Sequence, residues 1–261
     1  MARPPKGAVN PRVSVEDVMG LLSGEYGPFE WTPRYEPALE LVYTVLSQHT
    51  SDINSKRAFD SLMATFGSLE EVAKGDVDLI AHSINVGGLA RIKAPRIKAV
   101  LLAIQERRGD LDLHFLKELP LLEAKAWLRE LPGVGPKTAA IVLCFALGMP
   151  AMPVDTHIYR VCQRLGVIGP KVSADKAHDI LEEKVDPDEV FNFHVSYINH
   201  GRQVCRAQRP LCPECVVGAL CPSRKKFMSK ADLAALAEQE VQTPAGTAGA
   251  PMPHVPQPET Q

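Results

Sequence analysis

The sequence of 261 residues predicts an all-α fold divided into two helical domains. Apolar residues recur at helical spacing in one segment after another, whereas the alternating runs typical of half-buried strands are nearly absent. The chain is 45% hydrophobic and 23% charged, which is ordinary for a globular protein and excludes wholesale disorder or a fibrous protein. This length corresponds to one or two domains and is ample for a large buried core.

Three helices are expected in the first half of the chain. In Asp52 to Phe66 the apolar side chains fall on one stripe of a helix. Ser68, followed by Glu71, forms a capping box that opens a short second helix. A third helix is predicted from Ile92 to Arg107. Its Pro95 would lie in the first turn, where the missing N–H costs little.

A hairpin between two helices is predicted around the segment WLRELPGVGPKTAA, residues 127–140. Gly133 ends the first helix, Gly135 permits a tight turn, and the second helix runs on to Leu147. Glycines let a ligand approach the backbone closely, and the free N–H groups that open a helix attract phosphate. The alternative is an ordinary helix connection with Lys137 as a solvated surface charge.

Further helices follow the hairpin. Asp155 precedes the helical segment HIYRVCQRL, where a carboxylate could simply cap the helix. Ala177 and Leu181 share one face of another helix, and Asn192 to Gln203 is expected to form one more. Lys137 and Asp155 nevertheless combine an amine and a carboxylate beside a phosphate-binding turn, which indicates a catalytic pair as well as a cap.

The two ends of the chain differ in composition from the rest. From about Thr243 the sequence is rich in proline and lacks apolar periodicity, so we expect a disordered tail over residues 243–261. The first dozen residues are expected to form a loose basic arm. The longest apolar run, Ala139 to Gly148, is about half of what a membrane crossing needs. No signal peptide is evident near Met1, so we expect a cytoplasmic protein.

The formal net charge of −2 does not by itself indicate a nucleic-acid-binding protein. Charges are segregated along the chain, however. Basic residues dominate between Arg202 and Lys230 and between Arg91 and Lys98, whereas acids dominate between Asp175 and Glu189. A chain with segregated charge can present one basic face to a polyanion.

Four cysteines occur within 17 residues near the end of the helical region. In a reducing compartment such a group indicates a metal site rather than disulfides. Zinc is one alternative, although its sites usually show two short cysteine pairs around a longer loop. The even spread favours an iron–sulfur cube. The other two cysteines, Cys144 and Cys162, are expected to be buried core thiols. The expected ligands are Cys205, Cys212, Cys215 and Cys221.

Several of these segments together resemble one family. LPGVGPKTA, PVDTHIYRVCQRLG and HGRQVCRAQRPLCPECVVGALC, with VLSQHTSD and SINVGGLARIKAPRI upstream, resemble the endonuclease III family of base-excision DNA glycosylases. The resemblance covers roughly residues 37–222. It implies two helical domains with a DNA groove between them and a 4Fe–4S cluster on the four cysteines. The implied domains are residues 30–149, with the helix–hairpin–helix, and residues 1–29 plus 150–230, with the cluster loop.

The resemblance also assigns roles to the amine and the carboxylate. Lys137 matches the nucleophilic lysine of the bifunctional branch, which attacks the sugar C1′ of an extruded nucleotide and forms a Schiff base. Asp155 matches the catalytic carboxylate, which stabilises the positive charge that develops as the base leaves. The resemblance therefore implies both base removal and strand cleavage by β-elimination.

DNA contacts are implied at further positions. Leu89 occupies the place of an apolar wedge between base pairs, unless it simply docks on the core. Gln48 and His49 lie where the family fills the hole left by the flipped nucleotide, and the family commonly has Gln where this sequence has His49. Gln48 could instead only cap a helix. The other expected DNA-binding residues are Gly133, Gly135, Arg206 and Arg209.

The predicted function is therefore a bifunctional DNA glycosylase and AP lyase. Its partner would be duplex DNA with oxidised pyrimidines or abasic sites, and the protein is expected to be a monomer without membrane contact. One alternative is a monofunctional mismatch or uracil-type glycosylase, but these usually have Ser or Tyr at the position of Lys137. A non-catalytic DNA-structure-binding protein would not need both Lys137 and Asp155. An iron–sulfur electron carrier is disfavoured because nothing indicates a redox partner site.

Overall fold

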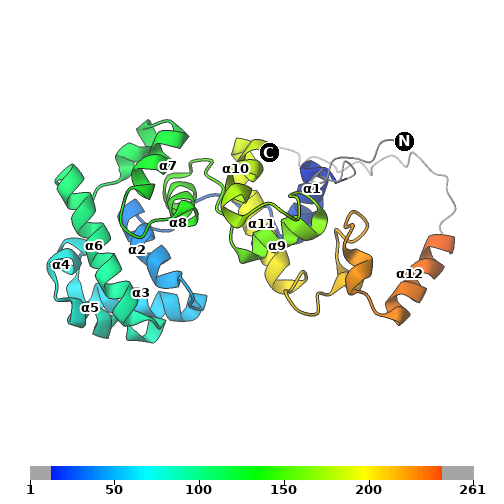
Figure 1. Cartoon of the computed structure of the whole chain (residues 1–261), viewed down its shortest axis with the longest axis horizontal. Coiled ribbons are helices and arrows are strands. Elements are labelled where there is room, and N and C mark those ends of the chain that lie inside the picture. The colour runs from blue at the N-terminus through cyan, green and yellow to red at the C-terminus, as the bar shows by residue number, and fades with distance from the viewer. Residues whose placement is uncertain (1–12, 243–261) are drawn as a thin grey trace, which may run out of the picture.

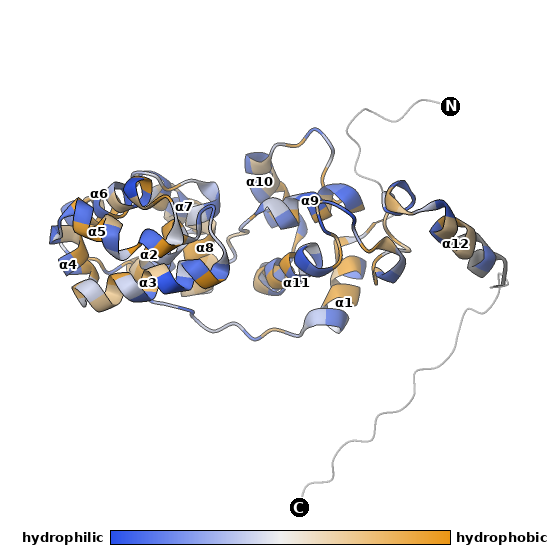
Figure 2. Ribbon diagram, turned by 90° about the horizontal axis from the view of Figure 1, so that it is seen from below, coloured by the Kyte–Doolittle hydropathy of each residue, from blue (hydrophilic) through white to orange (hydrophobic). Residues whose placement is uncertain are grey.

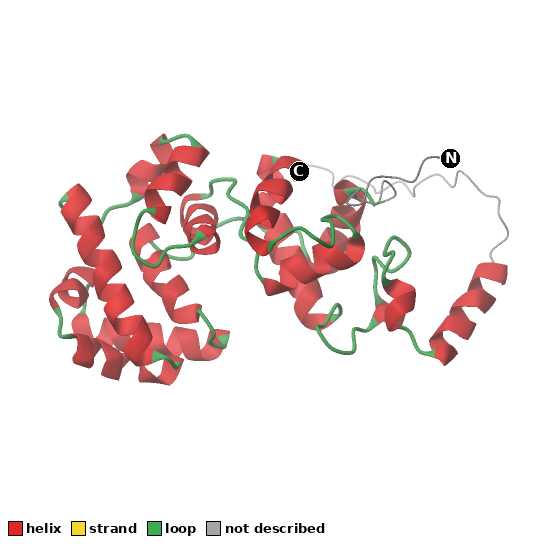
Figure 3. Ribbon diagram, viewed as in Figure 1, coloured by secondary structure: helices red, strands yellow, loops and turns green. Residues whose placement is uncertain are grey.

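The computed structural model describes residues 13–242, and helices but no strands occur in this range (Figure 3). The predicted all-α fold is therefore confirmed. The expected basic arm (residues 1–12) and disordered tail (residues 243–261) lie outside the described residues. None of the helices within that range has the length and apolarity of a membrane span.

The helices form two lobes (Figure 1). The central lobe is built around a large apolar core to which residues between Ala38 and Ala151 contribute. Leu41, Leu62 and Leu101 are fully buried in this core. Its helices are α2 (Pro37–Ser47), α3 (Asp52–Phe66), α4 (Leu69–Lys74), α5 (Val77–Ser83), α6 (Ala90–Arg108), α7 (Leu121–Arg129) and α8 (Pro136–Ile141).

The terminal lobe joins the beginning of the described chain to its second half. Its core packs α1 with residues from Met152 onward, and Phe193 and Tyr197 are fully buried there with their rings stacked 3.9 Å apart. The cysteine loop follows this lobe. Its helices are α1 (Val15–Tyr26), α9 (Thr156–Leu165), α10 (Ala174–Lys184) and α11 (Val190–Gln203). A last helix, α12 (Lys230–Gln242), stands apart from both lobes in Figure 1.

Local capping signals explain where several helices begin. The α3 helix has the predicted bounds, because the Ser51 side chain accepts from the backbone N–H of Asn54 and the apolar stripe follows at once. The capping prediction at Ser68 is also confirmed, since its side chain accepts from the N–H of Glu71 at 3.3 Å. Figure 2 shows hydrophilic and hydrophobic residues along the same helices.

Two helix predictions were wrong in detail. The α6 helix begins at Ala90 rather than Ile92, so Pro95 lies in its second turn and removes a hydrogen bond inside the helix. The helix after the hairpin does not continue regularly to Leu147. It changes after Ile141 into a π-helical turn, Val142–Ala146, and turns of this kind are frequent at functional sites.

The π-helical turn faces both lobes. Val142 and Leu143 belong to the central core, whereas Cys144 packs in the terminal core. The segment that leads from α1 to α2 crosses here, and the Trp31 indole donates to the carbonyl of Cys144 at 2.8 Å. Gly148 has φ +65, and a side chain there would meet the Trp31 ring at 3.1 Å. The chain therefore crosses between the lobes over a closely packed turn.

Candidate active-site cleft and cysteine loop

The hairpin between α7 and α8 brings Lys137 to the surface between the lobes. Gly133 has φ +78, the left-handed conformation that favours glycine. Gly135 is extended and precedes α8, and nothing lies within 4 Å of where its side chain would be, so a ligand can approach the backbone. Pro136 and Lys137 open the helix, and Lys137 is exposed. The loop therefore presents the amine at a helix start.

Asp155 is held at the N-terminus of α9. Its Oδ1 accepts from the N–H of Ile158 at 2.7 Å, so the carboxylate does cap the helix. The unpaired N–H groups of a helix start stabilise a negative charge. Asp155 is only half-buried, so the carboxylate is fixed in place and still reachable.

The segment before Asp155 is fixed by hydrogen bonds from the terminal lobe. His194 lies with Nδ1 2.9 Å from the carbonyl of Pro153, and His178 lies with Nδ1 2.7 Å from that of Met152. Glu182 accepts from the backbone N–H of Met152 at 2.9 Å. The same carboxylate pairs at 2.7 Å with Lys125 of α7, in the central lobe. The segment before Asp155 and the two lobes are thus tied together at one point.

Lys137 and Asp155 lie on the same cleft between the lobes, whose volume is about 510 Å³. Lys137 comes from the central lobe and Asp155 from the terminal lobe, so the fold brings together two residues that are 18 positions apart. The other lining residues are Arg34, Tyr43, Thr44, Ser47, Thr50, Asp52, Ile141, Phe145, Thr156, His157, His194, Val195, Ile198, Asn199 and Arg202.

His194 is a cleft residue that the sequence did not reveal. It is buried, and burial lowers the pKa of His194 to about 4, with Lys137 and Arg34 reinforcing the shift and Asp155 opposing it. The imidazole is therefore neutral at pH 7. Because a carbonyl only accepts, Nδ1 donates to Pro153 and Nε2 is left as an acceptor. Its only signal in the sequence is a histidine on the apolar face of a helix.

An ion pair joins the lobes across the cleft. Arg202 of α11 contacts Asp52 of α3, with Nη1 and Oδ2 2.8 Å apart. Both residues line the cleft and both side chains are largely exposed. Exposed pairs of this kind contribute little stability, so a phosphate could displace the carboxylate without large cost.

The positions expected to enter DNA lie outside the cleft lining. Leu89 is 49% exposed, so it is not docked in the core, and His49 is exposed as well. Both have left-handed backbones, with φ 53 and φ 55, which is uncommon for residues other than glycine. Strained backbone of this kind clusters at functional sites. Gln48 is the C-cap of α2, through its backbone N–H, as the alternative reading supposed.

Lys93 holds these two loops together. Its Nζ donates to the carbonyl of Leu46 at 2.7 Å, to Thr50 Oγ1 at 2.6 Å and to the carbonyl of Gly87 at 3.1 Å. The residue is 2% exposed, so its charge does not contribute to a basic face with the other basic residues between Arg91 and Lys98. Burial lowers the pKa of its amine. The buried lysine links the loop after α2 to the loop before α6, beside Leu89.

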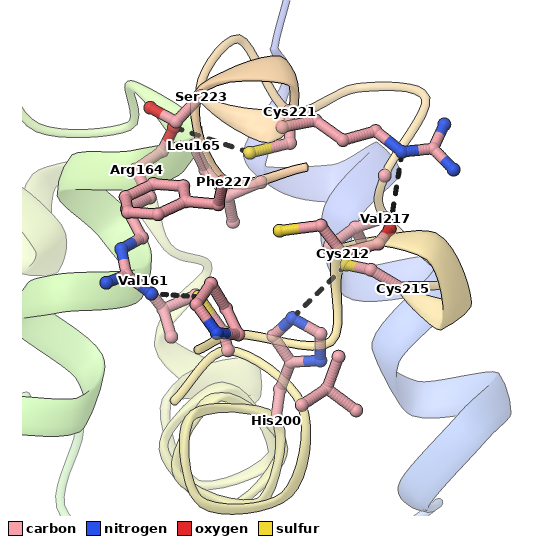
Figure 4. Close-up of a pocket in the computed structure, with 15 residues that line it drawn as sticks. Val161, Arg164, Leu165, His200, Cys212, Cys215, Val217, Cys221, Ser223 and Phe227 are labelled. Carbon is pink, nitrogen blue, oxygen red and sulfur yellow. Dashed lines mark hydrogen bonds between the residues drawn. The ribbon is translucent and has the colours of Figure 1, made fainter. Parts of the chain in front are cut away.

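The four cysteines of the loop line one cavity, and none of them forms a disulfide. Figure 4 shows the sulfur atoms of Cys212, Cys215 and Cys221 facing the same interior, with the His200 imidazole 3.6 Å from Cys215. Apolar side chains, including Phe227, complete the wall. The other two cysteines, Cys144 and Cys162, are buried in the terminal core, as predicted.

The thiols surround a space rather than converge on a point. Within residues 13–242 no group of three or more His, Cys, Asp or Glu side chains could hold a single metal ion. Burial, together with the neighbouring thiols, raises the pKa of Cys215 to about 12, and burial also raises the pKa values of Cys212 and Cys221. Thiolates in this cavity would need a compensating positive centre.

Two arginines of α9 hold the start of the cysteine loop, a support that the sequence did not reveal. Arg160 donates to the carbonyl of Cys205 at 3.0 Å, and Arg164 donates to the carbonyl of Arg206 at 2.7 Å. Arg164 also lies with Nη1 3.4 Å from the sulfur of Cys205. Arg206 and Arg209 are exposed on this loop, and Arg209 has a left-handed backbone with φ 49.

Comparison with known proteins identifies the family. The profile of the HhH-GPD superfamily of base excision DNA repair proteins matches residues 42–187, which is more than half of the chain. The chain belongs to this superfamily. It is similar, more particularly, to endonuclease III of Sulfolobus acidocaldarius, with 32% identity over 183 residues that make up 69% of this chain and 79% of the relative.

Two further similarities bear on the length and the fold. A relative from Arabidopsis thaliana is 37% identical over 186 residues, and the match spans 71% of this chain but only 60% of that relative's length. A solved structure of a trapped endonuclease III–DNA covalent intermediate has a TM-score of 0.71 and 27% identity, covering 82% of this chain and 97% of the other. The predicted resemblance to the endonuclease III family is confirmed, and the chain is a DNA glycosylase of base excision repair.

Proposed function

We propose that this protein is a bifunctional DNA glycosylase and AP lyase that removes oxidised pyrimidines from duplex DNA. The observation that carries the proposal is the shared cleft, where the exposed amine of Lys137 and the fixed carboxylate of Asp155 come from opposite lobes. A cleft of about 510 Å³ has room for one extruded nucleotide. The similarity to a covalently trapped endonuclease III–DNA complex supports a covalent route.

The chemistry follows from the two side chains. The neutral Lys137 amine attacks the sugar C1′, the glycosidic bond breaks, and the base leaves with the bonding electron pair and takes up a proton. The sugar ring opens to give a Schiff base on Lys137. Loss of a proton from C2′ then expels the 3′ phosphate by β-elimination. Asp155 stabilises the positive charge that develops at the sugar while the base departs.

Several groups position the DNA in this proposal. The duplex lies in the groove between a central domain of residues 30–149 and a terminal domain of residues 1–29 plus 150–230. Leu89 enters the stack as a wedge, and Gln48 and His49 fill the vacated space. Phosphates are bound by the backbone at Gly133 and Gly135. On the cysteine loop, Arg206 and Arg209 bind further phosphates.

The cysteine loop fits a 4Fe–4S cluster, which we propose as the resident cofactor on Cys205, Cys212, Cys215 and Cys221. The fit rests on four thiols, none of them in a disulfide, that line one cavity with largely apolar walls. When bound, the cluster would supply a positive centre that stabilises the thiolates. Arg160 and Arg164 hold the loop so that it presents its basic side chains to DNA.

The proposal also includes a monomeric protein that acts in the cytoplasm on duplex DNA containing damaged bases or abasic sites. Sedimentation of the protein with and without a single-lesion duplex tests the oligomeric state. A 1:1 complex is expected, and a stable dimer in the absence of DNA would contradict this part.

The test of the function is a panel of duplexes that each carry one lesion, assayed separately for base release and strand cleavage. Wild-type protein is expected to release oxidised pyrimidines and to cleave the strand. Lys137→Gln should lose both activities, and Asp155→Asn should slow base release on the order of 100-fold or more. Lys74→Gln is the matched control, because Lys74 pairs with Glu71 on the outside of the central lobe. Base release that persists in Lys137→Gln would contradict the proposal.

A further inference from the structure

A guanidinium group lies on the cleft and has no role in the chemistry described above. Arg34 comes from the segment that crosses from α1 to α2, and it lines the same cleft as Lys137 and Asp155. Its backbone N–H donates to the carbonyl of Phe145 at 3.4 Å, so the crossing segment is fixed where the side chain departs. The side chain is 41% exposed, and it lines the cleft.

Arg34 is held from behind by a buried carboxylate. Glu40 is fully buried in α2, and its two oxygens accept from Nε of Arg34, at 2.9 Å, and from Nη2. Thr44 donates to the same carboxylate at 3.2 Å. Burying the Glu40 carboxylate costs desolvation that an apolar side chain would avoid, so the pair is weak support for stability alone. What this pair does provide is a guanidinium with one fixed orientation.

Aromatic rings frame the guanidinium. Its central carbon lies 4.6 Å from the centroid of Tyr43 and 5.2 Å from that of Phe145, and both residues line the cleft. The Phe145 ring in turn packs edge-on against His194, at 5.1 Å. Rings of this kind stack on a flat base whatever its sequence context. The cleft therefore offers aromatic surface and a fixed cation beside the catalytic pair.

The guanidinium keeps donors for a ligand. Pairing with Glu40 uses Nε and Nη2, and no oxygen of residues 13–242 accepts from Nη1. Guanidinium groups donate and never accept. A base edge that meets Nη1 must therefore carry an acceptor, such as a carbonyl oxygen, and an amino group at the same place would leave two donors facing each other.

We propose that Arg34 reads the extruded base by donating to the carbonyl oxygen on ring carbon 4, with Glu40 as its positioning residue, so that the enzyme prefers pyrimidines of the uracil and thymine type over those of the cytosine type, which carry an amino group there. This inference rests on the proposed function, because it assumes that an extruded base enters the cleft. It adds the substrate class that the amine and the carboxylate leave undetermined.

The test compares 5-hydroxyuracil with 5-hydroxycytosine in otherwise identical duplexes, because the two bases differ in having a carbonyl oxygen or an amine at the same ring carbon. Single-turnover base release is measured for wild type, Arg34→Met, Arg34→Lys and the double variant Arg34→Met/Glu40→Gln. The double variant removes the buried charge that Arg34→Met alone would leave unpaired. Strand cleavage at a preformed abasic site is measured in parallel, since that substrate has no base to read.

Wild type is expected to release 5-hydroxyuracil about 10- to 100-fold faster than 5-hydroxycytosine. That preference should fall to within about threefold in Arg34→Met and in the double variant. Arg34→Lys should keep only part of it, because an ammonium lacks the fixed fork. Cleavage at abasic sites should remain near the wild-type rate. Arg107→Met is the matched control, since Arg107 also pairs with a glutamate and lies 5.8 Å from a ring centroid, outside the cleft.

Different outcomes would contradict the role of Arg34 and the proposed glycosylase function. Equal loss on both bases, or loss of abasic-site cleavage in the soluble double variant, would overturn the role of Arg34 and leave the glycosylase intact. An unchanged preference in Arg34→Met would overturn it as well. Wild-type protein that releases neither base and leaves abasic sites uncut would instead overturn the proposed function.

Discussion

The two regions that we propose to face DNA are held in place by different means. In the central lobe, Lys93 ties the loops of His49 and Leu89 through three protein oxygens. In the terminal lobe, the loop of Arg206 has only two short helical turns, Cys212–Glu214 and Arg224–Phe227, and packs around four thiols. The first region is held by contacts within the polypeptide, whereas the second would also depend on the proposed cluster.

The two lobes also differ in their buried histidines. In the described part of the chain they are His178, His194 and His200, all of them on α10 and α11 of the terminal lobe. Burial lowers the pKa of each, and the values for His194 and His200 fall to about 4. The terminal lobe is therefore expected to be the more sensitive of the two, both to loss of the proposed cluster and to acid.

The greatest change is expected from replacing two of the proposed cysteine ligands. In Cys212→Ser/Cys215→Ser, amide exchange in residues 211–227 should rise on the order of 100-fold, because this part of the loop has only short helical turns and packs around the thiols, whereas Arg160 and Arg164 hold the start of the loop. Exchange in residues 46–50 and 87–93 should not change. Cys144→Ala is the control, because Cys144 is a core thiol outside the loop. A cysteine loop that keeps its protection would show that the two regions do not differ.

The next largest effect is expected from acid, which should destabilise the terminal lobe through its buried histidines. The pKa of His194 is about 4 in the folded protein and 6.5 when exposed, so the unfolded chain takes up the proton first as the pH falls. Stability is therefore full above pH 6.5 and is lost toward pH 4, with a slope of up to about 1.4 kcal/mol per pH unit for this group. Urea unfolding of wild type and His194→Gln between these values measures the slope. An identical pH dependence in the variant would contradict the assignment.

A smaller effect is expected at Lys93. Lys93→Met leaves the carbonyls of Leu46 and Gly87 without their donor and should cost about 1–3 kcal/mol of unfolding free energy. DNA affinity should fall while its salt dependence stays the same, because the buried amine contacts no phosphate. Lys98→Met, on the same helix, is the control. A reduced salt slope in Lys93→Met would mean that the amine reaches DNA.

The smallest effect is expected from the exposed arginines of the cysteine loop. Arg206→Ala and Arg209→Ala should each reduce the slope of the logarithm of the binding constant against that of salt by about 0.9. Titrations at several salt concentrations, with Arg107→Ala as the control, measure this. Unchanged slopes in both variants would place the DNA elsewhere.

Sequence patterns predicted what depends on local signals. The bounds of α3 follow from a capping serine and one apolar stripe, and Asp155 caps α9 in the segment where it was expected. The π-helical turn after α8, the Arg34–Glu40 pair and the buried Lys93 were missed. Each of these depends on partners from other elements, which periodicity along one segment does not contain. Glu40 did leave a trace, as a carboxylate on the buried face of an apolar helix.

In the proposed mechanism, the amine of Lys137 forms a covalent bond with the sugar of the extruded nucleotide. Incubation with an abasic-site duplex and borohydride, followed by mass spectrometry of the digested adduct, tests for this bond. A stable protein–DNA adduct on the peptide that contains Lys137 is expected, and Lys137→Gln should give none. Failure of wild-type protein to form an adduct, or an adduct on another residue at undiminished yield in Lys137→Gln, would contradict the claim.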